Sequence, residues 1–261
     1  MPVSNADELG IRPLTARSVL LSTLLGLDPP VQPAARLVET ARLFGIGESA
    51  ARVALSRMAA AGEVVAEDGR YRLTGRLLDR QRRQEAGRHP PDEAWAGQWH
   101  VAVVTAERRS AAHRAELRTA MTAGRVAEWR EGVWTRPDNL PAPPLAAEVA
   151  GHCAWLTAAP VDDPAALASQ LWDLGGWAAR AQRLDDRLRA TRPDLDRGNT
   201  KALAPGFALS AAVLRHLAAD PLLPASLRPE GWPGNELRST YDSWDAAYRR
   251  LLADWHRSPA P

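Results

Sequence analysis

The chain has 261 residues, of which 45% are hydrophobic and 25% are charged, as is usual for a globular protein. The formal net charge is only +2, but residues 1–90 carry 13 arginines against 10 acidic residues, whereas the remainder carries 20 basic and 21 acidic residues. The single cysteine, Cys153, excludes an internal disulfide bond and a multi-cysteine metal site, and the six histidines show no metal-ligand spacing.

No signal peptide is visible, because the first residues, "MPVSNADELGIRP", are polar. The longest apolar run, "VLLSTLLGL", is too short to span a bilayer. We therefore expect a cytoplasmic protein that has no membrane partner, no bound metal and no cofactor.

Residues 14–78 contain three predicted helices followed by a hairpin. "TARSVLLSTLLGL" predicts a helix capped by Thr15, "AARLVETARLF" a second helix with one apolar face, and "ESAARVALSRMAAAG" a third that ends at Gly62. "EVVAEDGRYRLT" predicts two short strands that turn at Asp68-Gly69. This order is that of a winged helix-turn-helix, although a generic three-helix module gives the same order.

The segment Gly45–Ala50 allows a different interpretation, because it fits the G-x-G-x-x-A pattern of a dinucleotide-binding loop. Such a loop must follow a buried strand, and the preceding residues have helical periodicity instead. The glycines are therefore interpreted as the turn before the third helix.

The third helix has a predicted buried face, which consists of Ala50, Val53, Ala54, Met58 and Ala61. Ser49, Arg52 and Ser56 then share another face, with Arg57 beside them, and these side chain types suit base edges and phosphates in a major groove. The alternative is an ordinary solvated face on which Arg57 pairs with an acid such as Glu48 or Glu63.

The segment that follows this helix favours the DNA-binding interpretation. Residues 69–89 contain seven arginines against Asp79 and Glu85. A basic hairpin and a basic exit beside a recognition helix are typical of proteins that bind DNA. The predicted DNA-binding residues are Ser49, Arg52, Ser56, Arg57, Arg70, Arg72, Arg82 and Arg83.

A linker at residues 86–94 precedes a predicted βαββαβ segment. Its parts are the strand "WHVAVVTA", the helix "RRSAAHRAELRTAMTAG", the strands "RVAEWR" and "GVWTRP", the short helix "LAAEVAG" and the strand "HCAWLTAA". This order predicts a ferredoxin-like sandwich.

The pattern is helical from Asp163 onward. "DPAALASQLWDLGGWAARAQRLDDRLRA" predicts a long helix with a kink or close contact at Gly175-Gly176, and "ALAPGFALSAAVLRHLAAD" a second. An extended loop, "PLLPASLRPEGWPG", separates them from a last helix whose Trp244, Tyr248 and Trp255 predict a core stripe. The fold class expected is α+β, with a winged helix-turn-helix at 14–85, a ferredoxin-like domain at 95–160 and a helical domain at 161–258.

The sequence resembles the PaaX family of bacterial transcriptional repressors over nearly its whole length. The resemblance is carried by "RSVLLSTLLG", "LFGIGESAARVALSRMAAAG", "GRYRLTGRL", Trp95-x-Gly97-x-Trp99, "REGVWTRPDN", "LWDL" and "DPLLPASLRPEGWPG". It implies a dimeric winged-helix repressor that binds a palindromic operator in double-stranded DNA. In the system of the founding member, the regulated operon degrades phenylacetate and the inducer is phenylacetyl-coenzyme A.

An acyl-coenzyme A effector carries several phosphate charges, so its pocket is expected to combine an aromatic wall with arginines. Trp134 and Arg136, with Trp172 from the following helical part, are the predicted effector-binding residues. The alternative is that the two tryptophans simply pack a domain junction, and the resemblance does not fix the acyl group.

The rival class is an enzyme, because the ferredoxin-like domain of this family also resembles the small nucleases of CRISPR systems. Those nucleases hold a metal with an aspartate at the end of the first strand, where this chain has "VVTAE" with Thr105, Ala106 and Glu107. An acyl-coenzyme A hydrolase would need a Ser/His/acid set, and only Ser210 and His216 lie near each other in sequence. We therefore expect no catalytic residues, and a protein-binding adaptor is the third alternative.

Overall fold

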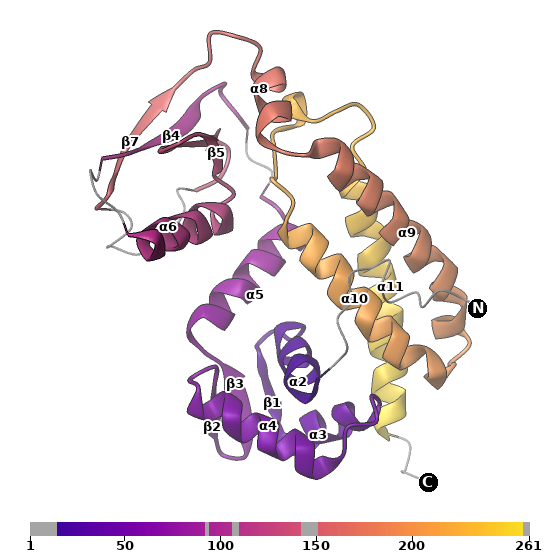
Figure 1. Ribbon diagram of the computed structural model, residues 1–261. Helices are drawn as coiled ribbons and strands as arrows, with labels where there is room; N and C mark the ends of the chain where they lie inside the picture. Colours follow the sequence, from indigo (N-terminus) through magenta and orange to yellow (C-terminus); the bar gives the residue numbers. More distant parts are fainter. Residues whose placement is uncertain (1–14, 92–93, 106–109, 142–150, 258–261) are drawn as a thin grey trace, which may run out of the picture. The chain divides into compact units, whose positions relative to one another are not determined.

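The computed structural model describes residues 15–91, 94–105, 110–141 and 151–257 (Figure 1). The mixed α+β class predicted from the sequence is confirmed, because long helices accompany two antiparallel sheets. By compactness the chain forms two units, and the predicted division into three domains stays a prediction. The first unit contains Met1–Arg88, Ala181–Ala218 and Gly234–Pro261, and the second contains His89–Arg180 and Ala219–Pro233.

The first unit is helical with one small sheet. Its elements are α2 (Ala16–Leu25), β1 (Val31–Pro33), α3 (Ala34–Arg42), α4 (Glu48–Ala60), β2 (Val64–Glu67), β3 (Arg70–Leu73), α5 (Gly75–Arg88), the later part of α9 (Leu174–Asp196), η1 (Thr200–Ala202), α10 (Leu203–Ala218) and α11 (Gly234–Arg257). The three helices and the hairpin predicted for its N-terminal part are confirmed.

Interactions between neighbouring residues explain where the first helix begins and where the hairpin turns. The Thr15 hydroxyl accepts a hydrogen bond from the Ser18 backbone N–H, and the Ser18 hydroxyl accepts one from the Thr15 N–H, which is a capping box. Asp68 and Gly69 have φ values of 49° and 71°, as a two-residue hairpin turn requires.

β1 was not predicted from the sequence. Val31–Pro33 pairs antiparallel with β3, so the small sheet has the order β1-β3-β2 (Figure 1). Prolines lie just before this strand and at its last position, and a strand of three residues is too short to show an alternation of polar and apolar side chains. Proline is tolerated there because β1 is an edge strand.

The buried face of α4 differs from the prediction. Ala51, Leu55 and Met58 are buried, at the spacing i, i+4, i+7, and they join the core made by α2, α3 and the hairpin. The predicted core residues Ala50, Val53 and Ala61 are exposed, because the neighbouring helices contact the next face round the helix. Composition alone did not separate these faces, since alanines lie on both.

The second unit is built on a four-stranded antiparallel sheet of order β5-β6-β4-β7. Its elements are β4 (Trp99–Val104), α6 (Ala111–Ala123), β5 (Ala127–Arg130), β6 (Val133–Pro137), β7 (Cys153–Ala158), α8 (Pro164–Leu171), the start of α9 and η2 (Ala225–Leu227). All four predicted strands and the first predicted helix are confirmed. The predicted helix "LAAEVAG" lies almost entirely outside the described residues.

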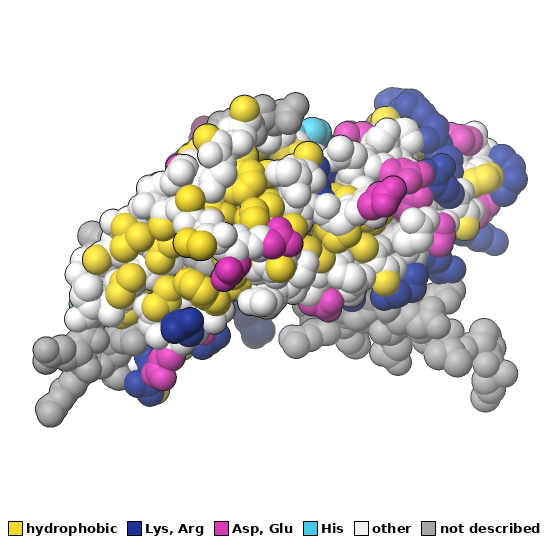
Figure 2. Space-filling view, turned by 90° about the horizontal axis from the view of Figure 1, so that it is seen from above, with side chains coloured by type: hydrophobic (Ala, Val, Ile, Leu, Met, Phe, Trp, Pro, Cys, Tyr) yellow, Lys and Arg dark blue, Asp and Glu magenta, His cyan; other side chains and the backbone are white. Residues whose placement is uncertain are grey.

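Two clusters of buried side chains hold the second unit together. Leu117 and Met121 of α6 pack against Ala102 and Trp134 of the sheet, and Trp99 anchors another cluster with α8 and the loop that contains η2. That loop is tied down by polar contacts, since the buried Asn139 amide donates to the Leu222 carbonyl at 2.8 Å. The edge strand β7 leaves Trp155 and Leu156 exposed, and Figure 2 shows hydrophobic side chains gathered over this unit.

The long helix predicted from Asp163 is broken. It divides at Trp172–Asp173 into α8 and α9, and the Asp173 carboxylate accepts a hydrogen bond of 2.8 Å from the Gly176 N–H at the start of α9. A Cβ on Gly176 would lie 2.1 Å from this carboxylate, so the close contact predicted here is confirmed. The core stripe of α11 is confirmed for Trp244 and Tyr248, which are both buried.

The N-terminal segment of the first unit meets the two later segments where α5 approaches α10 and α11. A Cβ on Gly87 would lie 2.4 Å from the Leu217 carbonyl oxygen and 2.7 Å from its carbon. The buried Arg238 of α11 donates to the Gly87 carbonyl at 2.8 Å. Glycine at this position therefore lets α5 lie directly against the backbone of α10.

None of the helices in the described part of the chain is long and apolar enough to cross a membrane.

We expect Gly87→Ala to lower the free energy of unfolding by about 1–3 kcal/mol, the usual cost of forcing extra atoms into a packed contact. The backbone atoms of α10 cannot rotate away, so the two helices must separate. Urea denaturation followed by circular dichroism measures the change. Gly175→Ala is the control, because a Cβ there has open space, and equal stability of the two variants would contradict the close contact.

Candidate nucleic-acid interface

The exposed face of α4 is polar and cationic. Ser49, Arg52, Ser56 and Arg57 are all exposed on it. Val53 lies among them with 46% of its surface exposed, so it is an apolar group on an otherwise polar face. Gly45, with φ of 70°, makes the turn that brings the chain from α3 into α4, which explains the glycines of this segment.

Glu48 in the first turn of α4 organises two of the arginines. Its carboxylate pairs with Arg52 at 2.9 Å and with Arg42 of α3 at 3.1 Å. The hydrogen bond from Arg52, together with the charges of both arginines, holds the pKa of Glu48 below its ordinary value. All three side chains are exposed, so water screens the pairs and an incoming phosphate or base edge can replace the carboxylate.

Arg57 does not make either ion pair that the sequence allowed. Glu48 is engaged as described, and Glu63 pairs with Arg17 of α2. Among the residues that the structure describes, the guanidinium groups of Arg57, Arg70 and Arg76 have no ion-pair partner. No described carboxylate neutralises these cations, so an anion from outside the protein can pair with them.

The other predicted contacts lie on β3 and α5. Arg70 and Arg72 are exposed on β3, where Arg72 pairs with Glu67 at 3.3 Å. Arg82 is exposed on α5 and pairs with Asp79 at 3.0 Å, whereas Arg83 is half-buried. All eight predicted DNA-binding residues thus belong to the first unit, on α4, β3 and α5.

The predicted effector-binding residues have different surroundings in the structure. Arg136 is 4% exposed, and its guanidinium donates to the carbonyls of Gly124, Leu140 and Pro141. Burial lowers its pKa to about 10. Trp134 belongs to the cluster under α6, whereas Trp172 packs with the cluster around Trp99.

Comparison with known proteins identifies the family. A family model described as PaaX-like protein matches residues 15–77. A solved structure of the uncharacterized protein Rv0674 from Mycobacterium tuberculosis is 44% identical, covers 92% of this chain and 98% of its own, and superposes with a TM-score of 0.70. The chain belongs to the PaaX-like family. A comparison with the curated proteins gave no match.

The matched segment of this PaaX-like protein runs from Thr15 into the first turn of α5, so it contains α4 and the hairpin. Val53 and Arg42 belong to the same surface but were missed in the sequence, and Arg76 is a further exposed cation, on α5. Val53 was assigned to the core, and Arg42 lies on the preceding helix. Arg76 is detectable only as one of the seven arginines of the basic segment.

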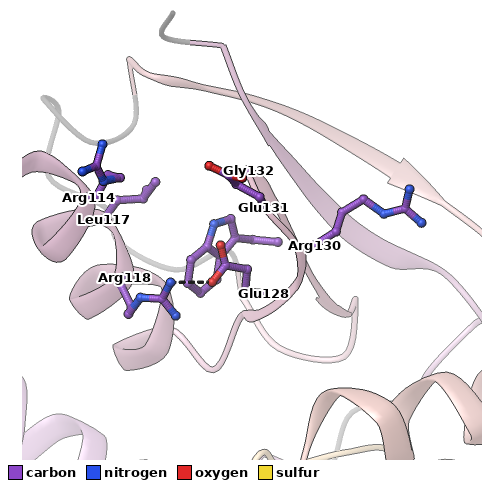
Figure 3. Close-up of a pocket in the computed structure, with 8 residues that line it drawn as sticks. Arg114, Leu117, Arg118, Glu128, Arg130, Glu131 and Gly132 are labelled. Atoms are coloured by element: carbon purple, nitrogen blue, oxygen red, sulfur yellow. Dashed lines mark ion pairs between the residues drawn. The ribbon is translucent and has the colours of Figure 1, made fainter. Parts of the chain in front are cut away.

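Trp134 lines a different hollow of the PaaX-like protein, with a volume of about 470 Å³ (Figure 3). The Arg118 guanidinium lies 5.6 Å from the centre of the Trp134 ring and pairs with Glu128 at 2.7 Å. Arg114 and Arg130 also line it. The hollow therefore has the aromatic wall and the arginines expected of the effector site, but the arginines are not the predicted one.

The described residues contain no group of three or more His, Cys, Asp or Glu side chains that could hold a metal ion. The Ser210 hydroxyl shares a hydrogen bond of 2.8 Å with the Tyr241 hydroxyl. Ala106 and Glu107, at the end of the strand compared with the nucleases, lie outside the described residues.

We expect Glu48→Gln to raise the affinity for random-sequence duplex DNA several-fold at low salt, because it frees Arg42 and Arg52 for phosphates. The logarithm of affinity should also fall more steeply with that of salt concentration. Fluorescence anisotropy at several salt concentrations measures both. Glu230→Gln, an exposed residue of the second unit, makes the same change in net charge, and an equal rise in this control would show a global charge effect instead.

Proposed function

We propose that this protein is a DNA-binding transcriptional regulator whose α4 enters the major groove. The observation that carries this proposal is the exposed face of α4, where small hydroxyls and Arg52 lie beside Arg57, which has no ion-pair partner among the described residues. Membership of the PaaX-like family supports it.

The topology of the first unit supports a winged helix-turn-helix. The order is helix, short strand, two helices and hairpin, and the second hairpin strand pairs with the short strand. In such domains the recognition helix presents its N-terminal residues to base edges, and backbone contacts fix its orientation. Here α4 is the recognition helix and the β2–β3 hairpin is the wing.

The side chains divide by the part of DNA that their chemistry suits. Ser49, Arg52 and Ser56 are placed to contact base edges, with Arg52 able to reach guanine through two hydrogen bonds. Val53 offers the apolar surface that a thymine methyl group prefers. The remaining arginines of the interface would neutralise phosphates and so set the affinity shared by all sequences. These are Arg57, Arg70, Arg72, Arg82 and Arg83.

For the second unit we propose a ferredoxin-like fold that takes part in assembly. The order β5-β6-β4-β7 places the first and third strands of the unit at the centre, as a split βαββαβ arrangement requires. β7 is an edge strand whose exposed Trp155 and Leu156 lie on opposite faces of the sheet, so a strand of a second copy added at this edge would cover apolar surface on both faces. A dimer would place two recognition helices about one helical turn of DNA apart, on a palindromic operator.

We further propose that the regulator is a cytoplasmic repressor, without catalytic activity, that an acyl-coenzyme A such as phenylacetyl-coenzyme A releases from DNA. The family supports regulation of phenylacetate catabolism. Selecting fragments of the source genome that the protein binds would identify the operator, and the neighbouring genes would name the pathway. Failure to enrich any sequence at low salt would refute DNA recognition.

We expect Arg52→Ala to reduce the preference for the operator over a scrambled duplex by about 1–3 kcal/mol, the value of a bidentate contact with guanine. Arg82→Ala should weaken both duplexes alike, because a phosphate contact carries no sequence information. Competition binding at fixed salt separates the two effects. A loss of preference in Arg82→Ala, with none in Arg52→Ala, would mean that α4 is not the recognition helix.

A further inference from the structure

A cavity of about 290 Å³ lies within the first unit, and none of its lining residues belongs to α4. Its walls come from all three chain segments of that unit. α2, β1, α3 and α5 contribute from the N-terminal segment, and α10 and α11 contribute from the two later segments.

Most of the wall is apolar surface whose polar groups are already engaged. Phe207 and Leu214 line it from α10, and Tyr241 and Tyr248 line it from α11. The Tyr241 hydroxyl is hydrogen-bonded with Ser210 at 2.8 Å, and the Tyr248 hydroxyl donates to the Leu203 carbonyl at 3.0 Å. The carbon atoms of these side chains are therefore what an occupant would contact.

Two polar groups of the cavity are not satisfied by the protein. Gln84 is 8% exposed, and its buried Oε1 atom has no hydrogen-bond partner. A buried acceptor of this kind costs stability unless a donor reaches it. The second group is Arg80, one turn earlier on the same face of α5, an exposed residue at the rim of the cavity that has no counterion among the described residues.

The surroundings of Arg80 favour an external anion. Desolvation, followed by the charges of Arg215, Arg83 and Arg17, lowers the pKa of Arg80. The acid of the cavity is already neutralised, because Asp245 pairs with Arg88 at 3.0 Å and with Arg249 at 2.8 Å. The cavity thus has an excess of positive charge at Arg80 and an apolar interior.

We propose that this cavity binds a small carboxylate with an apolar, ring-sized body and a hydroxyl or N–H donor. Arg80 pairs with the carboxylate, Gln84 Oε1 accepts from the donor, and the side chains of α10 and α11 enclose the body. About 290 Å³ is at the lower limit of ligand pockets, so a whole coenzyme A thioester does not fit inside.

The position of the cavity provides a route to the DNA-binding surface, and this part of the inference rests on the proposed function. α2 and α3 line the cavity and also pack on α4 through the buried core of the N-terminal segment. An occupant that fits only one arrangement of these helices biases the position of α4, and DNA and occupant then alter each other's affinity by the same factor.

The test measures binding of phenylacetate, 4-hydroxyphenylacetate and phenethylamine to the full chain by isothermal titration calorimetry, without DNA. We expect the two carboxylates to bind, 4-hydroxyphenylacetate the more tightly, and the amine not to bind. Arg80→Gln should weaken carboxylate binding at least tenfold. Arg187→Gln is the matched control, since Arg187 is exposed on α9 and does not line the cavity. Ala211→Phe, which places a ring in the cavity, should abolish binding.

Absence of binding by both carboxylates, or binding that survives Arg80→Gln and Ala211→Phe in folded protein, would overturn the site. Tight binding of phenylacetyl-coenzyme A that neither variant weakens would place the effector elsewhere and would also overturn it. DNA affinity is measured separately on the same variants. A protein that binds the carboxylate but no DNA would refute the proposed function and leave the cavity assignment intact.

Discussion

The absence of a side chain at Gly87 is the constraint on which the first unit depends. It allows α5 to contact the backbone of α10, where a Cβ would lie 2.4 Å from the Leu217 carbonyl oxygen. Arg238 of α11 adds a buried hydrogen bond to the Gly87 carbonyl. Through this contact the C-terminal helices become part of the same compact unit as the helices and hairpin of the N-terminal segment.

The same contact gives α5 two different roles. Arg76 and Arg82 lie on its exposed surface, whereas Gln84 is buried toward the cavity and Gly87 against α10. A helix that carries exposed arginines and also lines a cavity connects the two surfaces physically. The two-state behaviour expected of a ligand-controlled regulator requires an element of this kind.

The electrostatics of the candidate interface are a balance of exposed charges. Glu48 occupies Arg42 and Arg52 in the isolated protein, while Arg57 and Arg70 have no ion-pair partner among the described residues. Exposed ion pairs are weak, so DNA can exchange them for phosphate contacts at little cost. Under the proposed function, the Glu48 carboxylate at the start of α4 would also oppose non-specific phosphate binding, which favours discrimination between sequences.

The sequence by itself determined the elements whose signals are local. Thr15 as a cap, Asp68-Gly69 as a hairpin turn and the strand β4 follow from the chemistry of neighbouring residues, and so does the candidate face of Ser49, Arg52 and Ser56. Only the tertiary structure decided that Ala51 and Leu55 are buried instead of Ala50 and Val53, because helices rich in alanine present similar faces. It also decided that Arg136 is bound by backbone carbonyls and that Arg80 and Gln84 line a cavity. The cavity joins segments more than a hundred residues apart, whereas the partners of Arg136 and the buried face of α4 depend on how nearby segments pack, and no local pattern specifies either.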